Sequence, residues 1–175
     1  MELWREVDGA TLDVARSMLQ RACGSSRWVD RMLARRPFGG DAALKAAARE
    51  EWFALAEADW LEAFSHHPQI GDRTLAPPKP TSEGGSLAAR FPATHDLSAR
   101  EQSAVAVAGA RVIEQLAHAN AEYCAKFGFI FIVCATGKSA IEMLQLLRDR
   151  LDNDRATELR IAAEEQAKIT ALRLS

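Results

Sequence analysis

The sequence predicts an all-α fold, a single-domain helical bundle of about seven to nine helices with a long loop and one buried extended segment. Apolar residues recur every three or four positions over most of the chain, which is the spacing of one face of an α-helix. Only one short run is rich in aromatic and β-branched residues, and no second run is present that could pair with it as a strand. The 175 residues, 48% of them hydrophobic, are enough for one domain with a sizeable core.

The composition excludes several classes of protein. A net charge of −2 and an isoelectric point near 6.1 argue against a general nucleic-acid or membrane-surface binder. No apolar run is long enough to span a bilayer, and residues 1–6 lack the hydrophobic region of a signal peptide. Cys23, Cys124 and Cys134 are widely spaced and lie in apolar patterns, which is typical of free thiols in a reducing compartment. We therefore expect a cytoplasmic protein that binds neither nucleic acid nor membranes.

Four helices are expected before the first long loop. Gly24 and Pro37 end the first two, because glycine favours a helix C-terminus and proline cannot continue a helix. Ser26 and Asp41 are the expected N-caps of the second and third helices, and Asp59 is the expected start of the fourth. The expected ranges are residues 11–22, 26–36, 41–55 and 59–65.

Helical periodicity disappears from Gly71 to Asp96. Residues 77–86 are mainly proline, glycine and serine, which break helices. We expect a mobile loop over about residues 72–97, with room for one helical turn at residues 87–91. A loop of this length inside a compact domain is typically disordered or functional, for example as a lid over a site.

The last part of the chain is expected to hold three helices and the extended segment. The longest helical pattern runs from Ser98 to Lys126. Residues 127–135 follow and are apolar almost throughout. Because no partner strand exists for them, we expect a buried extended segment among helices. Helices are expected again at residues 139–153 and 156–174.

His67 lies where the fourth helical pattern stops and the loop begins. Pro68 disfavours helical geometry for the residue before it, so His67 is expected at the end of the helix. Two interpretations fit this position. A partly charged His67 could stabilise the helix C-terminus, or its imidazole, which changes charge near neutral pH, could face a cleft.

The residues that follow the loop form a second candidate site. Ser98-Ala99-Arg100-Glu101 has the spacing of a capping box, in which the serine and glutamate side chains satisfy free amides at a helix start. Glu101 either caps the helix or faces the same cleft as His67, and the two roles are compatible. Gln102 could offer its amide to a ligand or lie in solvent.

Arg173 lies on the inward side of the last helical pattern. It follows Ile169 by four positions and Gln166 by seven, so the three residues share one helix face. The guanidinium of Arg173 either extends to solvent at the helix end or supplies a fixed cation that binds a carboxylate through two hydrogen bonds.

Other kinds of site find little support in the sequence. Residues 135–139 resemble the end of a phosphate-binding P-loop, but Ile132 stands where that motif requires its first glycine. No cysteine has a histidine partner that is evident in the sequence. No metal site is predicted either, because the candidate ligands have no recognised spacing. Those candidates are His66, His67, Asp72 and His95.

Several short motifs occur in the order found in one enzyme family. They are His67-Pro68 with Ile70-Gly71, Ser98-Ala99-Arg100-Glu101-Gln102, Tyr123 with Lys126-Phe127-Gly128-Phe129, Lys168-Ile169 with Leu172-Arg173-Leu174, and Arg36-Pro37-Phe38. Over nearly its whole length the chain resembles the 2-oxo-4-hydroxy-4-carboxy-5-ureidoimidazoline (OHCU) decarboxylases, which complete the breakdown of uric acid to allantoin. Each motif alone is weak, but together they are specific.

The resemblance implies one all-helical OHCU decarboxylase-like domain over residues 1–175, and a homodimer. It implies decarboxylation of OHCU to (S)-allantoin and carbon dioxide without a cofactor. It also implies catalytic roles for His67, Glu101 and Arg173, and so favours their functional interpretations. The substrate-binding positions that it implies are Pro68, Ser98, Ala99, Arg100, Gln102, Phe131, Ile132, Val133, Cys134 and Ala135.

The chain departs from the family pattern at two places. The family's Phe-Gly-Phe-Pro-Phe is here Phe127-Gly128-Phe129-Ile130-Phe131, so Ile130 replaces a proline expected beside the substrate. The loop between His67 and Glu101 is also longer than in the shorter family members. We expect these changes to act on substrate affinity and loop ordering and to preserve the chemistry.

Two other functions are the alternatives. A non-catalytic helical interaction module would use the His-Pro segment and the apolar run as a groove, and it would not need His67, Glu101 and Arg173 in one pocket. A metal-assisted hydrolase of ureido compounds would require bound zinc and would lose activity with chelators.

Overall fold

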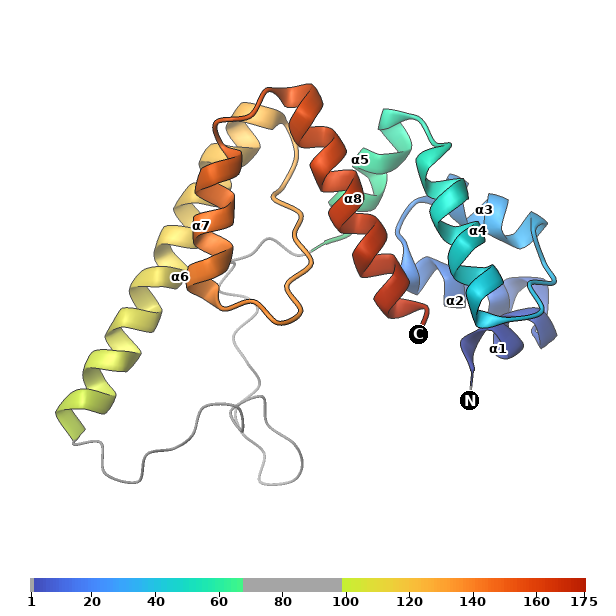
Figure 1. Cartoon of the computed structure of the whole chain (residues 1–175), viewed down its shortest axis with the longest axis horizontal. Coiled ribbons are helices and arrows are strands. Elements are labelled where there is room, and N and C mark those ends of the chain that lie inside the picture. The colour runs from blue at the N-terminus through green and yellow to red at the C-terminus, as the bar shows by residue number, and fades with distance from the viewer. Residues whose placement is uncertain (1, 68–98) are drawn as a thin grey trace.

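The computed structural model describes residues 2–67 and 99–175, and all regular structure in these two ranges is helical (Figure 1). The predicted all-α class is therefore confirmed. The predicted loop at residues 72–97, its helical turn, Pro68 and Ser98 lie outside the described residues. None of the described helices is long and apolar enough to cross a membrane. The helices are α1 (Leu3–Gly9), α2 (Leu12–Ala22), α3 (Ser26–Ala34), α4 (Asp41–Phe53), α5 (Glu57–Ser65), α6 (Ala99–Phe127), α7 (Ala140–Arg150) and α8 (Arg155–Arg173).

The first helix, α1, is not predicted by the sequence pattern. It has only 7 residues, and Val7 is the one that it buries, so it carries too little apolar periodicity to be recognised. Distant residues hold it in place instead. The Asp8 carboxylate accepts the backbone amides of Phe38 and Gly39 at 2.9 Å, and Arg36 donates to the Asp8 carbonyl at 2.9 Å.

Predicted helix starts differ from the observed ones by one or two residues. Ser25, not Ser26, caps α3, because its hydroxyl oxygen accepts the Trp28 amide at 3.3 Å. Ser26 instead donates its amide and hydroxyl to the Glu62 carboxylate of α5, at 3.1 and 2.6 Å. Helix α5 begins two residues before Asp59, whose carboxylate accepts a backbone amide at that end.

Tryptophan side chains join helices that are distant in the sequence. The Trp28 indole of α3 donates to the Ala48 carbonyl of α4 at 3.0 Å, and the Trp52 indole of α4 donates to the Ala163 carbonyl of α8 at 2.9 Å. Both indoles are almost completely buried, so they contribute apolar contact area as well as hydrogen bonds. They place α8 directly against the N-terminal group of helices, as Figure 1 shows for α4 and α8.

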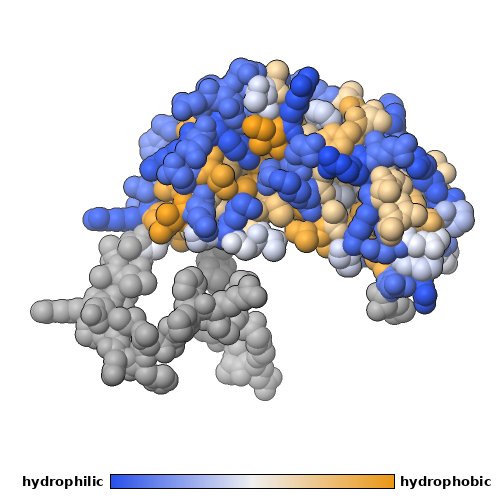
Figure 2. Space-filling view, in the orientation of Figure 1, coloured by the Kyte–Doolittle hydropathy of each residue, from blue (hydrophilic) through white to orange (hydrophobic). Residues whose placement is uncertain are grey.

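Helices α6 and α7 lie side by side on the other side of α8 (Figure 1). The segment between them leads the chain back along the pair, so that α7 runs in roughly the same direction as α6 and α8 runs in the opposite direction. Hydrophilic and hydrophobic residues intermingle on the face seen in Figure 2.

The predicted extended segment is confirmed at residues 128–135, with no partner strand among the described residues, and it is buried at Phe129 and at residues 131–134. Gly128 adopts a φ of 82° where α6 ends, a left-handed conformation that glycine takes without steric cost. The rings of Phe129 and Phe131 pack edge-on against Tyr123, with centroids 5.8 and 5.4 Å apart. Aromatic packing therefore takes the place of strand pairing.

A buried ionic network holds the extended segment against α8. The Glu158 carboxylate of α8 accepts hydrogen bonds from Arg150 Nε, at 2.6 Å, and from the Tyr123 hydroxyl. Arg150 Nη1 donates to the Ile132 carbonyl at 2.8 Å. Burial and the hydrogen bond to Glu158 raise the pKa of Tyr123 far above its ordinary value, so its hydroxyl stays protonated and donates.

Candidate functional site

His67 lies just beyond the C-terminal end of α5, and its amide donates to the Phe64 carbonyl at 3.1 Å. The half-buried imidazole faces α8, where Nε2 lies 2.6 Å from Oε1 of Gln166. The Gln166 amide nitrogen in turn donates to the Thr170 hydroxyl oxygen at 3.1 Å. The end of α5 and the inward face of α8 together fix the orientation of the ring.

Arg173 is the last residue of α8 and lies beside His67. Its Nη1 donates to the Ala22 carbonyl, at the end of α2, at 3.3 Å. His67 and Arg173 line a cavity of about 680 Å³ with residues from the end of α2, including Arg21. They also line a second cavity of about 290 Å³, whose other wall is formed by residues 133–136. The structure thus brings two predicted catalytic residues together with three predicted substrate-binding residues, Val133, Cys134 and Ala135.

The surroundings of His67 favour its neutral form. Burial lowers the pKa of His67 below its ordinary value, and the positive charge of Arg173 lowers it further. The hydrogen bond with Gln166 acts in the opposite direction and is smaller than either of these effects, and the neighbouring His66 has the smallest, lowering effect. No carboxylate lines either cavity among the described residues. A neutral imidazole in this position has a lone pair with which it can accept a proton.

The turn between α2 and α3 packs directly on His66. A Cβ added at Gly24 would lie 2.7 Å from side-chain atoms of His66, so this approach requires glycine. Cys23, the residue before it, is fully buried, and burial raises the pKa of its thiol to about 11 although Thr170 hydrogen-bonds it. The Cys23 thiol is therefore protonated at neutral pH and unsuited to act as a nucleophile.

The backbone of the extended segment is hydrogen-bonded at some atoms and open at others. The Cys134 amide donates to the Glu165 carboxylate at 2.7 Å, and the Cys134 carbonyl accepts from Lys138 at 2.8 Å. By contrast, the amide and carbonyl of Val133 make no hydrogen bond with any other described residue. Backbone groups without a protein partner beside His67 are free to bind a polar ligand.

Two of the predicted substrate-binding residues have core side chains. Phe131 and Ile132 are each 2% exposed, and neither lines the cavities around His67. The Phe131 amide donates to Asn120 at 3.1 Å, and the Ile132 carbonyl accepts from Arg150. The Ile132 amide and the Phe131 carbonyl make no hydrogen bond with other described residues. The substrate contacts of Phe131 and Ile132 therefore stay predictions.

The start of α6 is not brought to this site. The residues from 99 to 102 form the first turn of α6, close to where the capping box predicts a helix start. Figure 1 shows this end of α6 far from the C-terminal ends of α5 and α8, where His67 and Arg173 lie. The catalytic role of Glu101 and the substrate contacts of Ala99, Arg100 and Gln102 therefore stay predictions, as do those of Pro68 and Ser98.

A family model described as OHCU decarboxylase matches residues 10–175. The chain belongs to the OHCU decarboxylase family. It is 43% identical over 155 residues to the uric acid degradation bifunctional protein TTL of Arabidopsis thaliana. The matched region covers 87% of this chain but only 44% of that protein. It is 30% identical over 139 residues to the 2-oxo-4-hydroxy-4-carboxy-5-ureidoimidazoline decarboxylase of Amia calva, with 79% of this chain and 73% of the relative covered.

Solved structures agree with this family assignment. A crystal structure of an OHCU decarboxylase in the presence of (S)-allantoin superposes with a TM-score of 0.64 at 36% identity, covering 89% of this chain and 92% of the other. A crystal structure of an (S)-allantoin synthase gives the same TM-score at 16% identity, covering 99% of this chain and 53% of the other, which supports the fold alone.

Gln166, which contacts His67, and Thr170, which contacts Gln166, are not identified as part of a site by the sequence. Gln166 is fully buried in the apolar stripe of α8, and a buried polar side chain requires a hydrogen-bond partner. A glutamine within the apolar stripe, seven positions before Arg173, is therefore the feature of the sequence that could have indicated a buried hydrogen bond here. Its partner could not be named in advance, because His67 lies 99 positions away along the chain.

A metal site finds no support among the described residues. Within residues 2–67 and 99–175, no group of three or more His, Cys, Asp or Glu side chains is placed to hold a metal ion. Asp72 and His95, two of the candidates considered from the sequence, lie outside these ranges. The metal-assisted alternative would therefore need ligands from residues 68–98.

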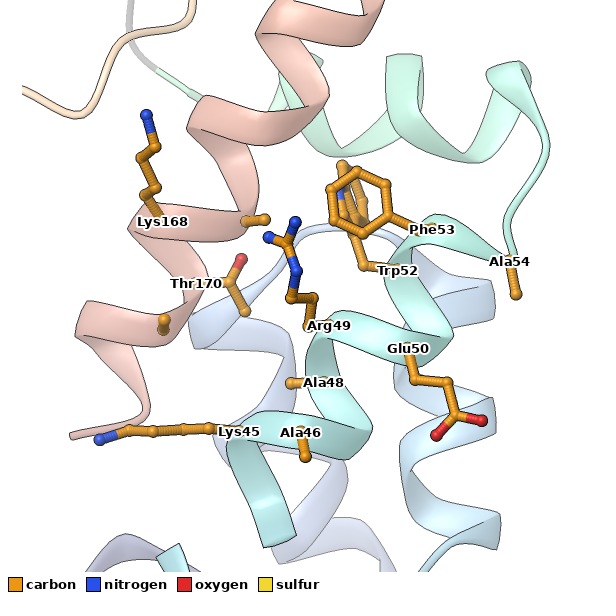
Figure 3. A pocket seen from close by; sticks show the side chains of 12 residues that line it. Lys45, Ala46, Ala48, Arg49, Glu50, Trp52, Phe53, Ala54, Lys168 and Thr170 are labelled. Carbon is orange, nitrogen blue, oxygen red and sulfur yellow. The ribbon is translucent and has the colours of Figure 1, made fainter. Parts of the chain in front are cut away.

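A cavity of about 910 Å³ lies between α4 and α8 (Figure 3), and His67 does not line it. Its cationic side chains are already paired, Lys45 with Asp41 at 2.9 Å and Arg49 with Glu164 at 3.1 Å. The Arg49 guanidinium also lies over the Phe53 ring, 4.6 Å from the centroid. This cavity is lined by none of the predicted site residues.

Proposed function

We propose that this chain decarboxylates OHCU to (S)-allantoin and carbon dioxide, without a cofactor, in the breakdown of uric acid. The observation that carries the proposal is the cavity shared by His67, Arg173 and residues 133–136 in a member of the OHCU decarboxylase family. The 36% identity to an OHCU decarboxylase crystallised in the presence of (S)-allantoin supports the same substrate and product.

The substrate supplies its own electron sink. Ring carbon C4 of OHCU carries the carboxylate and a hydroxyl, and the neighbouring C5 forms a ring C=N bond. When the C4–carboxylate bond breaks, its electron pair forms C4=C5, and the C=N electrons move to the nitrogen, which takes up a proton. The enol then loses its hydroxyl proton to give C4=O, and C5 takes up a proton on one face. The protein therefore has to orient the ring, stabilise charge and move protons.

The residues at the cavity match these tasks. Arg173 holds an anionic or polar part of the substrate, because its guanidinium can form two parallel hydrogen bonds. His67 exchanges protons with the centre that bears the carboxylate and hydroxyl. The open backbone groups of Val133 bind polar atoms of the ring. Glu101 is proposed to bind the ureido or ring N–H groups, or to orient His67, as the family resemblance implies.

The proposal is tested with freshly made OHCU. Urate, urate oxidase and hydroxyisourate hydrolase generate the compound in the cuvette, and circular dichroism follows the formation of (S)-allantoin after the chain is added. We expect rapid formation of one enantiomer, with the same rate in the presence of a chelator. A slow racemic decay would reject the activity, and a rate abolished by the chelator would reject decarboxylation without a metal ion. The metal-assisted hydrolase would instead release ammonia from ureido compounds in a reaction that the chelator stops.

We also propose that the protein is a cytoplasmic homodimer. The family resemblance supports the dimer, and the free cysteines, with Cys23 and Cys134 buried, are consistent with a reducing compartment. Sedimentation equilibrium at several concentrations tests the dimer: a single mass of twice 19.2 kDa is expected, and a monomer mass throughout would reject it.

A further inference from the structure

Gln166 makes the only hydrogen bond that the described side chains offer to the His67 ring. Its side chain is fully buried on the inward face of α8, and a buried amide requires hydrogen-bond partners. The amide spans two groups: Oε1 lies 2.6 Å from His67 Nε2, and Nε2 donates to the Thr170 hydroxyl oxygen at 3.1 Å. The Gln166 amide thus contacts the candidate catalytic ring through its oxygen and the buried Thr170 through its nitrogen.

The orientation of the Gln166 amide indicates where the His67 proton lies. An amide oxygen can only accept, so a contact of 2.6 Å with Oε1 requires a proton on His67 Nε2. The other end of the amide is consistent with this direction, because Thr170 has an oxygen that accepts the Gln166 N–H while it also hydrogen-bonds the Cys23 thiol. In a neutral imidazole only one nitrogen is protonated, which leaves Nδ1 with the lone pair.

We propose that Gln166 is a positioning residue that holds His67 in the Nε2–H tautomer and so makes Nδ1 the nitrogen that exchanges protons with the substrate. The assignment of Nδ1 to the reaction rests on the proposed function, whereas the tautomer itself does not. In the enol step described above, the substrate O–H bond breaks, the proton moves to Nδ1, and the O–H electron pair closes C4=O as the C4=C5 electrons take up a proton from water at C5.

A neutral amide suits this position better than a carboxylate would. Among the described residues, the charged or titratable groups around His67 are Arg173 on α8, His66 directly after α5 and Arg21 at the end of α2, and none of them is a carboxylate. They favour the neutral ring. A carboxylate at the place of Gln166 would favour the imidazolium and remove the Nδ1 lone pair at neutral pH. Gln166 therefore orients the ring without charging it.

The tautomer can be measured without any substrate. Long-range ¹H–¹⁵N correlation spectra of the uniformly ¹⁵N-labelled chain at neutral pH separate protonated from unprotonated ring nitrogens, and a His67→Gln spectrum assigns the resonances among the four histidines. We expect His67 to carry its proton on Nε2. A proton on Nδ1 would overturn the proposal even if the chain is a fully active decarboxylase.

Two variants then connect the tautomer to turnover. Gln166→Met removes the acceptor at similar volume, and we expect a mixture of His67 tautomers and a loss of kcat of about tenfold, as for the loss of one hydrogen bond, with little change in KM. Gln166→Glu should raise the pKa of His67 and move the acid limb of the kcat/KM profile to higher pH by about one unit or more. Gln145→Met, at an exposed position of α7, is the matched control and should behave as wild type.

The outcomes separate this proposal from the proposed function. If the wild-type chain does not act on OHCU, the proposed function fails, and the spectra still decide the tautomer. If the chain is active and Gln166→Glu folds with an unchanged pH profile, Gln166 does not act through His67. Should Gln166→Met fail to fold, the wild-type spectra and the Gln166→Glu profile remain as independent tests.

Discussion

At the scale of single residues, the neutral form of His67 is a consequence of its environment. In a peptide the pKa of a histidine imidazole is about 6.5. Burial and the nearby Arg173 guanidinium both penalise the protonated ring in the folded chain. The unfolded chain therefore binds this proton at a higher pH than the folded chain does. As the pH falls below about 6.5, His67 contributes progressively to destabilising the fold.

Replacing His67 or Glu101 tests the two predicted catalytic side chains. His67→Ala and Glu101→Ala should each remove turnover of OHCU, because general acid–base groups and substrate contacts are lost, while the fold is retained. Turnover is measured by circular dichroism of (S)-allantoin, and folding by near-ultraviolet circular dichroism. His118→Ala, on the exposed face of α6, is the control and should keep full activity. Near-normal activity in a folded variant would remove that residue from the mechanism.

Arg173 is expected to affect both substrate binding and the titration of His67. Arg173→Ala should raise KM and lower kcat, together at least about tenfold in kcat/KM, through the loss of a charged hydrogen bond. Because the arginine lowers the pKa of His67, its removal should raise that pKa and move the acid limb of the kcat/KM profile to higher pH. Arg160→Ala, an exposed position on the same helix, provides the comparison. An active variant with an unshifted profile would show that Arg173 only extends to solvent.

At the scale of elements, the extended segment depends on groups that belong to its neighbours. It lacks strand partners among the described residues, and its backbone is held by Asn120 of α6, Arg150 of α7 and Glu165 of α8. Three helices therefore determine the position of the segment that forms one wall of the cavity beside His67. Loosening one of these anchors should disturb both the core and the site.

The buried Arg150–Glu158 pair is the anchor whose loss should cost most stability. Glu158→Gln leaves the arginine charge uncompensated in a site where Arg150 is only 8% exposed. We expect the free energy of unfolding to fall by about 3–5 kcal/mol, measured by urea denaturation. Glu57→Gln breaks the exposed pair with Arg155 and should cost at most about 1 kcal/mol. Equal losses in the two variants would contradict the structural role of the buried pair.

The elements show how far the sequence could be interpreted in advance. Long amphipathic stretches such as α2 and α8 are predictable because their periodicity is a local property of the chain. The 7-residue α1 is not predictable, because it is held by hydrogen bonds from its own Asp8 to the segment after α3, which is distant in the sequence. The sequence likewise predicts His67 as a site residue but does not predict its partner Gln166. Pairing across 99 positions is decided by tertiary packing, which a single sequence does not display.

At the scale of the whole molecule, α8 links the stability of the fold to the geometry of the site. Along its length it contacts the Trp52 indole through the Ala163 carbonyl, carries Gln166 against His67, and ends at Arg173 beside α2. The same helix anchors Arg150 through Glu158. A displacement of α8 would therefore separate the site residues at the same time as it opens the core.

This arrangement predicts that activity and helical structure are lost in one transition. Trp52→Phe removes the indole hydrogen bond to α8 and part of a side chain that is 2% exposed, so unfolding should require about 2 kcal/mol less free energy. Urea titrations followed by far-ultraviolet circular dichroism and by residual decarboxylase rate should shift together. Trp4→Phe, in the partly exposed α1, should shift both midpoints less. If the rate of Trp52→Phe disappeared at a lower urea concentration than its helix signal, α8 would move from the site without unfolding, and the coupling inferred from its contacts would be wrong.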